Sequence, residues 1–319
     1  MKTSEHIRLS IIPYSPNLKN EWDLFVESSK NGTFLLKRDY IDYHSDRFPD
    51  HSLIITRNGI IYSILPACKI KNDIHSHAGL TYGGLIMSRK CTSAEILEIF
   101  TLIKEYFKSE GIVNFIYKPV PHIYHSLPSE EDLYALFRID AKLVERKVAS
   151  VVFKDERIKF RHIRKSGINK AIQAMVKVRE TDDFKTFWTI LSSNLLLKYN
   201  TYPVHTLEEI ENLSKKFPKE IKLFGAFIED RMEGGVIIYE TSQVAHCQYI
   251  SASPYGKATG SLDLIFDILI NDVFKDKMYF DFGTSNEDGG KILNEQLIYQ
   301  KEGFGGRAIC YDTYSIPIN

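Results

Sequence analysis

The residues best suited to chemistry lie in two predicted strands of the second half of the chain. His246 and Tyr249 belong to the predicted strand 243–251, and Asp281 belongs to the predicted strand 278–282. Histidine has the ordinary pKa that lies nearest neutrality, so it can take a proton from an attacking nucleophile. We therefore predict His246, Tyr249 and Asp281 as catalytic residues. The alternative is structural, because a lone strand histidine often belongs to a core and a strand-end aspartate can cap a turn.

Alternation along the strand 243–251 predicts which way its side chains point. His246 and Gln248 are expected on one face of the sheet, and Cys247 and Tyr249 on the other. A backbone N–H beside this strand is a candidate donor to a developing oxyanion.

A glycine-containing loop, residues 253–260, precedes a predicted helix. Gly256 and Gly260 allow a close backbone approach, Lys257 adds positive charge, and the N-terminus of a helix attracts phosphate. We predict that these three residues hold a pyrophosphate if the ligand carries one, the alternative being an ordinary helix-capping loop. The corresponding loop of the first half, residues 85–92, has no glycine, so we predict no such site there.

A basic run, residues 157–170, stands out in a chain with 41 basic and 41 acidic residues. Four of its cations share one broad face if the run is helical: Arg157, Arg161, Arg164 and Lys165. Such a face suits a diphosphate or an RNA backbone. We predict Arg161, Arg164 and Lys165 as substrate-binding residues, with a solvated helix face as the alternative.

Two prolines stiffen the segment that follows the predicted strand 112–117. Lys118, His122 and Tyr124 lie on this segment, at the end of a strand where sites tend to form. We predict that these three residues contact substrate. The sequence predicts no metal site, because its histidine pairs lack the spacing of a ligand set.

The order of predicted elements occurs twice along the chain. In the first half, a hairpin around Asn58-Gly59 precedes an extended segment 75–84, a helix 93–108 and the strand 112–117. In the second half, the strands 222–229, 235–240 and 243–251 precede a helix 261–274 and the strand 278–282. We predict an α/β (α+β) protein of two tandem domains, residues 1–150 and 151–319, each a mixed sheet flanked by helices.

The composition is that of a globular protein, with 44% hydrophobic and 26% charged residues and a net charge of zero. A charge balance of this kind argues against a globally electrostatic nucleic-acid binder, and we predict no DNA partner. The start has no signal peptide, no apolar stretch is long enough to span a membrane, and the four cysteines form no CxxC pair. These features predict a cytoplasmic protein. Serine-hydrolase, P-loop and zinc-protease motifs are absent.

Five segments together resemble bacterial FemABX-like proteins, which are tandem proteins of the GNAT superfamily. They are 28–48 (SSKNGTFLLKRDYIDYHSDRF), 117–138 (YKPVPHIYHSLPSEEDLYALFR), 160–171 (FRHIRKSGINKA), 222–240 (KLFGAFIEDRMEGGVIIYE) and 279–307 (YFDFGTSNEDGGKILNEQLIYQKEGFGGR). The most specific parts are the Ile-Arg-Lys run 163–165 and the motif Lys301-x-Gly303-Phe304-Gly305.

The resemblance implies two GNAT-like units and an N-acyltransferase that forms an amide bond on an amine, with its site mainly in the second half. Characterised relatives move an amino acid from aminoacyl-tRNA to a peptidoglycan precursor, whereas ordinary GNAT enzymes use acyl-CoA. Acyl-CoA and aminoacyl-tRNA therefore both stay open as donors, with a cell-wall or surface-polysaccharide precursor as a candidate acceptor. Two alternatives remain: acetyl-CoA-dependent acetylation of a small amine or amino-sugar, and a non-catalytic binding module for nucleotide-linked sugars or RNA.

Overall fold

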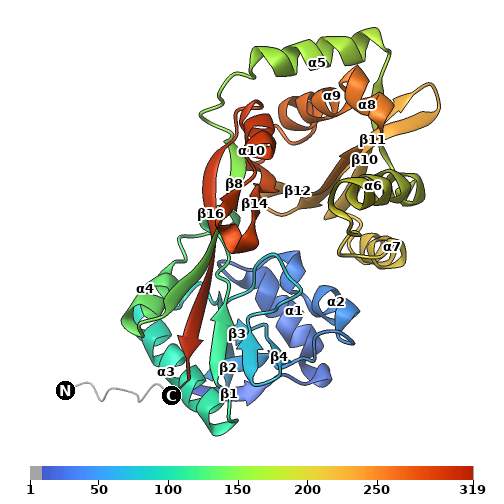
Figure 1. Ribbon diagram of the computed structural model, residues 1–319. Helices are drawn as coiled ribbons and strands as arrows, with labels where there is room; N and C mark the ends of the chain where they lie inside the picture. The colour runs from blue at the N-terminus through green and yellow to red at the C-terminus, as the bar shows by residue number, and fades with distance from the viewer. Residues whose placement is uncertain (1–8, 319) are drawn as a thin grey trace. The chain divides into compact units, whose positions relative to one another are not determined.

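The structure is a computed structural model that describes residues 9–318. The chain divides into two compact units, unit 1 from Met1–Lys147 and Cys310–Asn319, and unit 2 from Val148–Ile309 (Figure 1). The division at residue 150 assigned residues 310–319 to the second half, whereas the structure groups them with unit 1. The reason is that the last strand, β16 (Arg307–Pro317), pairs antiparallel with β7 (Asn114–Tyr117).

Unit 1 contains two groups of strands, in the orders β1-β2-β3-β6 and β4-β5-β7-β16. Their bounds are β1 Leu9–Pro13, β2 Leu53–Arg57, β3 Ile60–Leu65, β4 Cys68–Ile70, β5 Asp73–His75 and β6 Ile86–Met87. The predicted hairpin is confirmed, because β2 and β3 flank Asn58 and Gly59, whose φ angles are 51° and 81°. The predicted strand 75–84 is wrong. Positive φ angles at His77 and Gly84 break the extended chain between β5 and β6.

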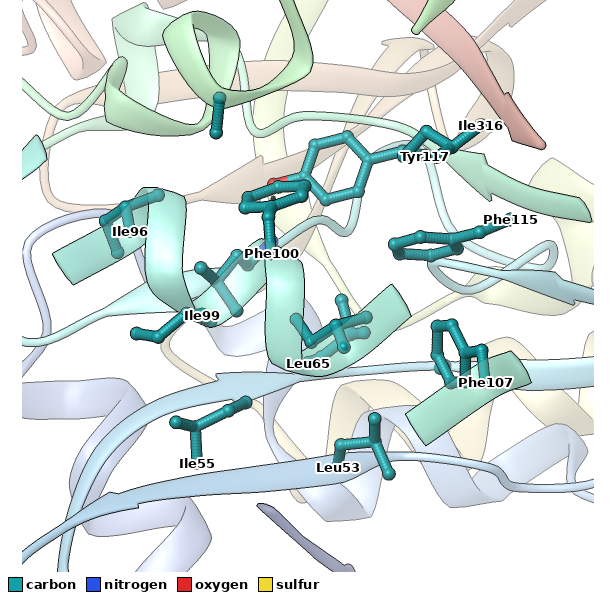
Figure 2. Packing of buried hydrophobic residues seen from close by; sticks show 14 of the residues in the cluster. Leu53, Ile55, Leu65, Ile96, Ile99, Phe100, Phe107, Phe115, Tyr117 and Ile316 are labelled. Carbon is teal, nitrogen blue, oxygen red and sulfur yellow. Dashed lines mark hydrogen bonds between the residues drawn. The ribbon is translucent and has the colours of Figure 1, made fainter. Parts of the chain in front are cut away.

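Helix α3 organises the core of unit 1. The helices of this unit are α1 Lys19–Ser28, α2 Arg38–Ile41, α3 Ser93–Ser109 and α4 Glu131–Arg138. Apolar residues at helical spacing give α3 one buried face, and Thr92 and Glu95 form a capping box at its start. Figure 2 shows the cluster that this face forms with the strands: Ile96, Ile99, Phe100, Phe107, Leu53, Ile55, Leu65, Phe115 and Tyr117.

Unit 2 contains a mixed sheet in the order β8-β13-β12-β11-β10-β9. The bounds are β8 Lys142–Phe153 (which begins in unit 1), β9 Lys177–Thr181, β10 Ile221–Ile228, β11 Arg231–Glu240, β12 Val244–Ala252 and β13 Tyr279–Thr284, with a small ribbon of β14 Asn286–Glu287 and β15 Ile292–Leu293. Strands β12 and β13 are parallel, and their neighbours pair antiparallel. Parallel neighbours need a crossover, which the helices between β12 and β13 provide.

Helices cover both faces of this sheet. They are α5 His162–Gln173, α6 Phe184–Tyr199, α7 Leu207–Lys216, α8 Pro254–Thr259, α9 Ser261–Ile268 and α10 Glu295–Glu302. Figure 1 shows α5 and α9 side by side, and Val236 and Ile238 of β11 belong to the core beneath them. On the other face, Gly235 of β11 lies against Phe187 of α6. The mixed sheet between helices confirms the predicted fold class. Within residues 9–318, no helix combines the length and apolarity that a membrane span requires.

Candidate functional site

A pocket of about 590 Å³ opens in unit 2 where β12 and β13 part. The parallel pairing of these strands runs from Val244 and Tyr279 to His246 and Asp281, where it stops. Beyond that point Ile250 of β12 and Phe282 of β13 line the pocket. The gap between two strands, beside a helix N-terminus, is thus the place where this fold leaves room for a ligand.

The walls of the pocket are mainly apolar and come from both faces of the sheet. Helix α6 contributes Leu191, Leu195 and Leu197, and α9 contributes Leu262 and Phe266. The rest of the apolar lining includes Ile250 of β12, Phe282 of β13, Leu297 of α10, and Phe304. A small polar network lies on one side, where Asn194 Nδ2 donates to Ser251 Oγ (2.8 Å) and Lys257 Nζ donates to Asn194 Oδ1 (2.7 Å). Apolar walls with a few placed polar groups are typical of small-molecule sites.

Lys301 of α10 is the buried charge of this pocket, with only 5% of its surface exposed. Its Nζ donates to the carbonyl oxygens of Gly283 (2.9 Å) and Thr284 (2.7 Å), just beyond Asp281 on β13. Burial lowers the pKa of Lys301 to about 8, although the nearby Asp281 acts in the opposite direction. Our sequence-based site residues did not include Lys301, even though it opens the Lys-x-Gly-Phe-Gly motif.

His246 and Asp281 form a hydrogen-bonded pair, and they are the last two residues paired between β12 and β13 before these strands part. His246 Nδ1 donates to Asp281 Oδ2 over 2.8 Å, and the backbone N–H of Gly283 donates to Asp281 Oδ1 over 2.7 Å. Asp281 is fully buried and His246 is 9% exposed. Because a carboxylate only accepts, Nδ1 carries the proton and Nε2 is left as the basic nitrogen. The structure thus brings together two of the three predicted catalytic residues.

Strand β12 contains a bulge between His246 and Tyr249. Ile238 of β11 pairs with Cys247, but Ile237 pairs with Tyr249, so Gln248 is an extra residue. Residues directly opposite each other on neighbouring strands point to the same face. A bulge of this kind interrupts the ladder, re-aims side chains and often lies next to an active site.

The bulge corrects the predicted alternation. Tyr249 points to the same face as His246 and away from Cys247, because Gln248 adds one residue to the count. The hydroxyl of Tyr249 lies 2.6 Å from Nδ1 of His205. Burial raises the pKa of Tyr249 to about 12, so its hydroxyl stays protonated at neutral pH. His246, Tyr249 and Asp281 border the strand gap but do not belong to the pocket lining.

The predicted glycine loop is wrong as a loop, because residues 254–259 form the short helix α8. Ser253 caps it and accepts from the N–H of Gly256. A Cβ on Gly256 would lie 2.0 Å from the carbonyl oxygen of Glu233, so this glycine lets α8 pack on β11. Gly260 has a φ of 77°, and a Cβ there would lie 2.3 Å from the carbonyl oxygen of Gly167 in α5. Gly256, Lys257 and Gly260 as pyrophosphate ligands stay a prediction.

The predicted helical face of the basic run is wrong in part, because α5 begins only at His162. Arg157 precedes the helix and donates to the carbonyl oxygen of Lys275 (2.9 Å). Arg161 is the N-cap residue; it lies over the ring of Tyr299 and forms an ion pair with Glu302 (3.3 Å).

Arg164 and Lys165 differ in their surroundings. Arg164 forms an ion pair with Asp263 of α9 (2.8 Å) and lies 5.5 Å from the ring centre of Phe304, whereas Lys165 is exposed. Through these two contacts Arg164 of α5 binds α9 and the pocket wall, so its guanidinium also has a structural role. Only Lys165 of the three predicted substrate ligands in this run is fully open to solvent.

The three residues predicted in unit 1 differ in accessibility. Lys118 is half-buried, and burial lowers its pKa. Tyr124 is buried, with its hydroxyl 3.0 Å from that of Tyr311. His122 is exposed and lines a pocket of about 510 Å³. Within residues 9–318, no group of three or more His, Cys, Asp or Glu side chains is arranged to hold a metal ion.

Solved structures share this fold, although no protein-family model and no curated protein sequence matches the chain. FemX has a TM-score of 0.66 at 11% identity, with 97% of each chain covered. L-PGS from Bacillus licheniformis has a TM-score of 0.61 at 11% identity, covering 96% of this chain and 92% of that one. A tandem GNAT protein from the clavulanic acid biosynthesis pathway has a TM-score of 0.51 at 9% identity, covering 98% and 99%. The chain therefore has the FemABX/GNAT-like tandem fold that its segments predict.

Proposed function

We propose that the chain is an N-acyltransferase that forms an amide bond on an amine, with the donor held in the pocket of unit 2. The observation that carries this proposal is the gathering of three features where β12 and β13 part. These are the apolar pocket, the buried ammonium of Lys301, and the His246–Asp281 pair. The fold shared with FemX and a tandem GNAT protein supports the same class of reaction.

In this mechanism the amine nitrogen attacks the donor carbonyl, and a C–N bond forms as the carbonyl oxygen becomes negative. Lys301 supplies the charge that stabilises this oxygen: two of its three N–H donors bind Gly283 and Thr284, and one is left for substrate. His246 takes the proton of the amine at Nε2, while Asp281 holds the ring in position. The bond to the leaving group then breaks: CoA leaves as a thiolate, whereas the ribose oxygen of tRNA leaves as a hydroxyl by taking the proton that His246 received from the amine.

Both donors fit these requirements, and the transfer of an aminoacyl group is our leading hypothesis because the sequence segments resemble FemABX-like proteins. The acceptor is an amine of a cell-wall or surface-polysaccharide precursor in this proposal. Lys257 at the pocket and the exposed Lys165 on α5 are the cations that we propose for donor phosphates.

The test is a panel of acetyl-CoA, longer acyl-CoAs, aminoacyl-tRNA and UDP-linked muropeptides, with melting temperature and amide product measured for each. A donor that binds only the folded chain raises its melting temperature. His246→Gln is expected to keep the shift but to lower product formation about 100-fold or more. His162→Gln, on the exposed start of α5, is the matched control and should retain activity. A panel without any shift, or full activity of His246→Gln, contradicts the proposal.

A further inference from the structure

The pocket of unit 2 has an aromatic interior. Phe266, Phe282 and Phe304 line it, and none of the three is more than 2% exposed. Their ring centres lie between 4.9 and 5.7 Å apart, so the three rings form one contiguous surface. The proposed amide transfer requires a carbonyl beside Lys301 but places no demand on the group that this carbonyl carries. The aromatic surface is therefore a feature of the pocket that the reaction itself leaves unexplained.

These phenylalanines lie next to the ammonium that is proposed to bind the donor carbonyl. Phe282 immediately precedes Gly283, whose carbonyl oxygen accepts from Lys301 Nζ. Phe304 follows Lys301 by three residues, and its backbone N–H donates to the carbonyl oxygen of Lys301 over 3.1 Å. The substituent of a carbonyl bound at Lys301 thus has phenylalanine side chains as its neighbours.

Along α6 the apolar lining continues from the interior to the solvent. Leu191 is buried, Leu195 is half-buried and Leu197 is 86% exposed, and all three line the pocket. The volume of about 590 Å³ lies in the range that drug-sized ligands occupy. An acetyl group has a single methyl beyond its carbonyl carbon, so it leaves most of this apolar surface in water. An apolar chain of several carbons buries that surface, which is favourable.

The charges of the lining disfavour a cationic acyl group. None of the described residues that line the pocket is acidic, whereas three are lysines: Lys198, Lys257 and Lys301. Lys198 and Lys257 are exposed, where they suit the phosphates of a donor, and Lys301 is buried. A second ammonium beside Lys301 would have no counterion in a medium that screens charge poorly. An aminoacyl donor meets this condition with an uncharged side chain and its α-amino group in the neutral form.

We propose that this pocket selects a donor whose acyl group is uncharged and apolar and extends several carbons beyond the carbonyl. The inference rests on the proposed function, which places the donor in this pocket. Two sources supply such a group: a medium-chain acyl-CoA, and an aminoacyl-tRNA with an apolar side chain such as that of leucine. In both, the apolar chain packs against Phe266, Phe282 and Phe304 while the carbonyl oxygen accepts from Lys301.

Calorimetric titration of the full chain with two pairs of ligands tests this proposal and separates the two sources. One pair is octanoyl-CoA and acetyl-CoA. The other is the amide of leucine, or of lysine, with 3′-amino-3′-deoxyadenosine, a stable copy of the aminoacyl end of tRNA. In the pair that represents the true donor, the apolar member is expected to bind at least about ten-fold more tightly, because burial of two methylene groups suffices for this factor.

The outcomes distinguish this inference from the proposed function. If ligands bind but neither pair shows a preference for its apolar member, the inference is overturned and the donor site stands. If none of the four ligands binds, the proposed function fails and the inference fails with it. A preference in one pair identifies the source of the acyl group.

Leu262→Asn and Ile268→Asn provide a matched pair of variants. Both side chains are half-buried on α9 and pack against the same core cluster, but only Leu262 lines the pocket. Each change places an amide at a half-buried apolar position, so both should lower the melting temperature to a similar extent. Only Leu262→Asn is expected to weaken binding of the preferred apolar ligand, about five-fold, with no change for its partner in the pair. An unchanged affinity ratio in a folded Leu262→Asn protein overturns the assignment, and the comparison within each pair needs no variant.

Discussion

Each unit has a gap between two strands that are separated in sequence by a helix, and this gap is open in unit 2 but filled in unit 1. In unit 2 the gap between β12 and β13 holds a pocket, with the lysine of α10 on its wall. In unit 1 the strands β6 and β7 are likewise separated in sequence by a helix, but Tyr117 of β7 reaches across. Its hydroxyl accepts from the N–H of Leu85, beside β6, and donates to Asp132 of α4, each over 2.7 Å.

The difference shows that one arrangement of elements leaves room for a ligand in unit 2, whereas in unit 1 the side chain of Tyr117 fills the same space. Tyr117 is fully buried and Asp132 is 3% exposed, so a hydrogen-bonded aromatic ring occupies the space in unit 1. The helix after the second strand supplies a carboxyl in unit 1 and an ammonium in unit 2. We therefore predict that the gap of unit 1 serves stability and that of unit 2 serves chemistry.

The largest expected effect comes from removal of the Tyr117 side chain that fills the gap of unit 1. Tyr117→Ala should lower the free energy of unfolding by about 3–5 kcal/mol, the cost of deleting a large buried aromatic side chain. Urea denaturation measures this change. The specific activity of the folded fraction should stay the same, and a loss of activity per folded molecule would show that the gap of unit 1 takes part in the reaction.

The corresponding change in unit 2 should affect activity rather than stability. Lys301→Met removes the proposed donor to the oxyanion and is expected to lower product formation about 100- to 1000-fold. The free energy of unfolding should change little, because the lower cost of burying methionine offsets the loss of the hydrogen bonds to Gly283 and Thr284. Lys170→Met, on the exposed side of α5, is the control in the same assay.

The pH dependence of activity should report the state of Lys301. Burial lowers its pKa to about 8, and the proposed role needs the cation. Product formation is therefore expected to fall about ten-fold per pH unit above 8. Lys301→Arg, which keeps its charge at high pH, should remove this fall. A rate that instead rises through pH 8 would assign Lys301 the role of a base.

The smallest effect concerns the pH dependence of stability. Burial raises the pKa of Asp132 to about 7 from an ordinary value near 3.8. The folded state thus binds the proton more tightly than the unfolded state does. This contribution to stability is complete below the ordinary pKa and is lost as the pH rises through about 7. Asp132→Asn should make urea midpoints between pH 5 and pH 8 more nearly equal, and an unchanged pH profile would exclude Asp132 as its source.

Local signals sufficed for the predictions that held. The Asn58-Gly59 turn places two residues that tolerate positive φ between apolar runs, and β2 and β3 flank it as predicted. The strands that contain His246 and Asp281 also followed from the sequence pattern, whereas the catalytic role of the two residues stays a prediction. In each case the information lies within a few neighbouring residues.

The errors share a different cause. The bulge at Gln248 depends on how β12 pairs with β11, and the close packing of Gly256 and Gly260 depends on strands and helices far away in sequence. Arg164 as a substrate ligand stays a prediction, but its ion pair with Asp263, 99 residues away, could not be read from the sequence. Such contacts have no local signature.

By itself, the amino-acid sequence determined most of the element order, the fold class and the types of residue available for chemistry, because propensity, periodicity and caps act over short distances. Tertiary structure alone decided that Lys301 is buried beside the strand gap and that Tyr117 fills the matching gap of unit 1. Burial changes the free energy of a charge according to the solvent that surrounding elements exclude. The same side chain is a solvated cation on an open helix face and a candidate catalytic group in a closed pocket.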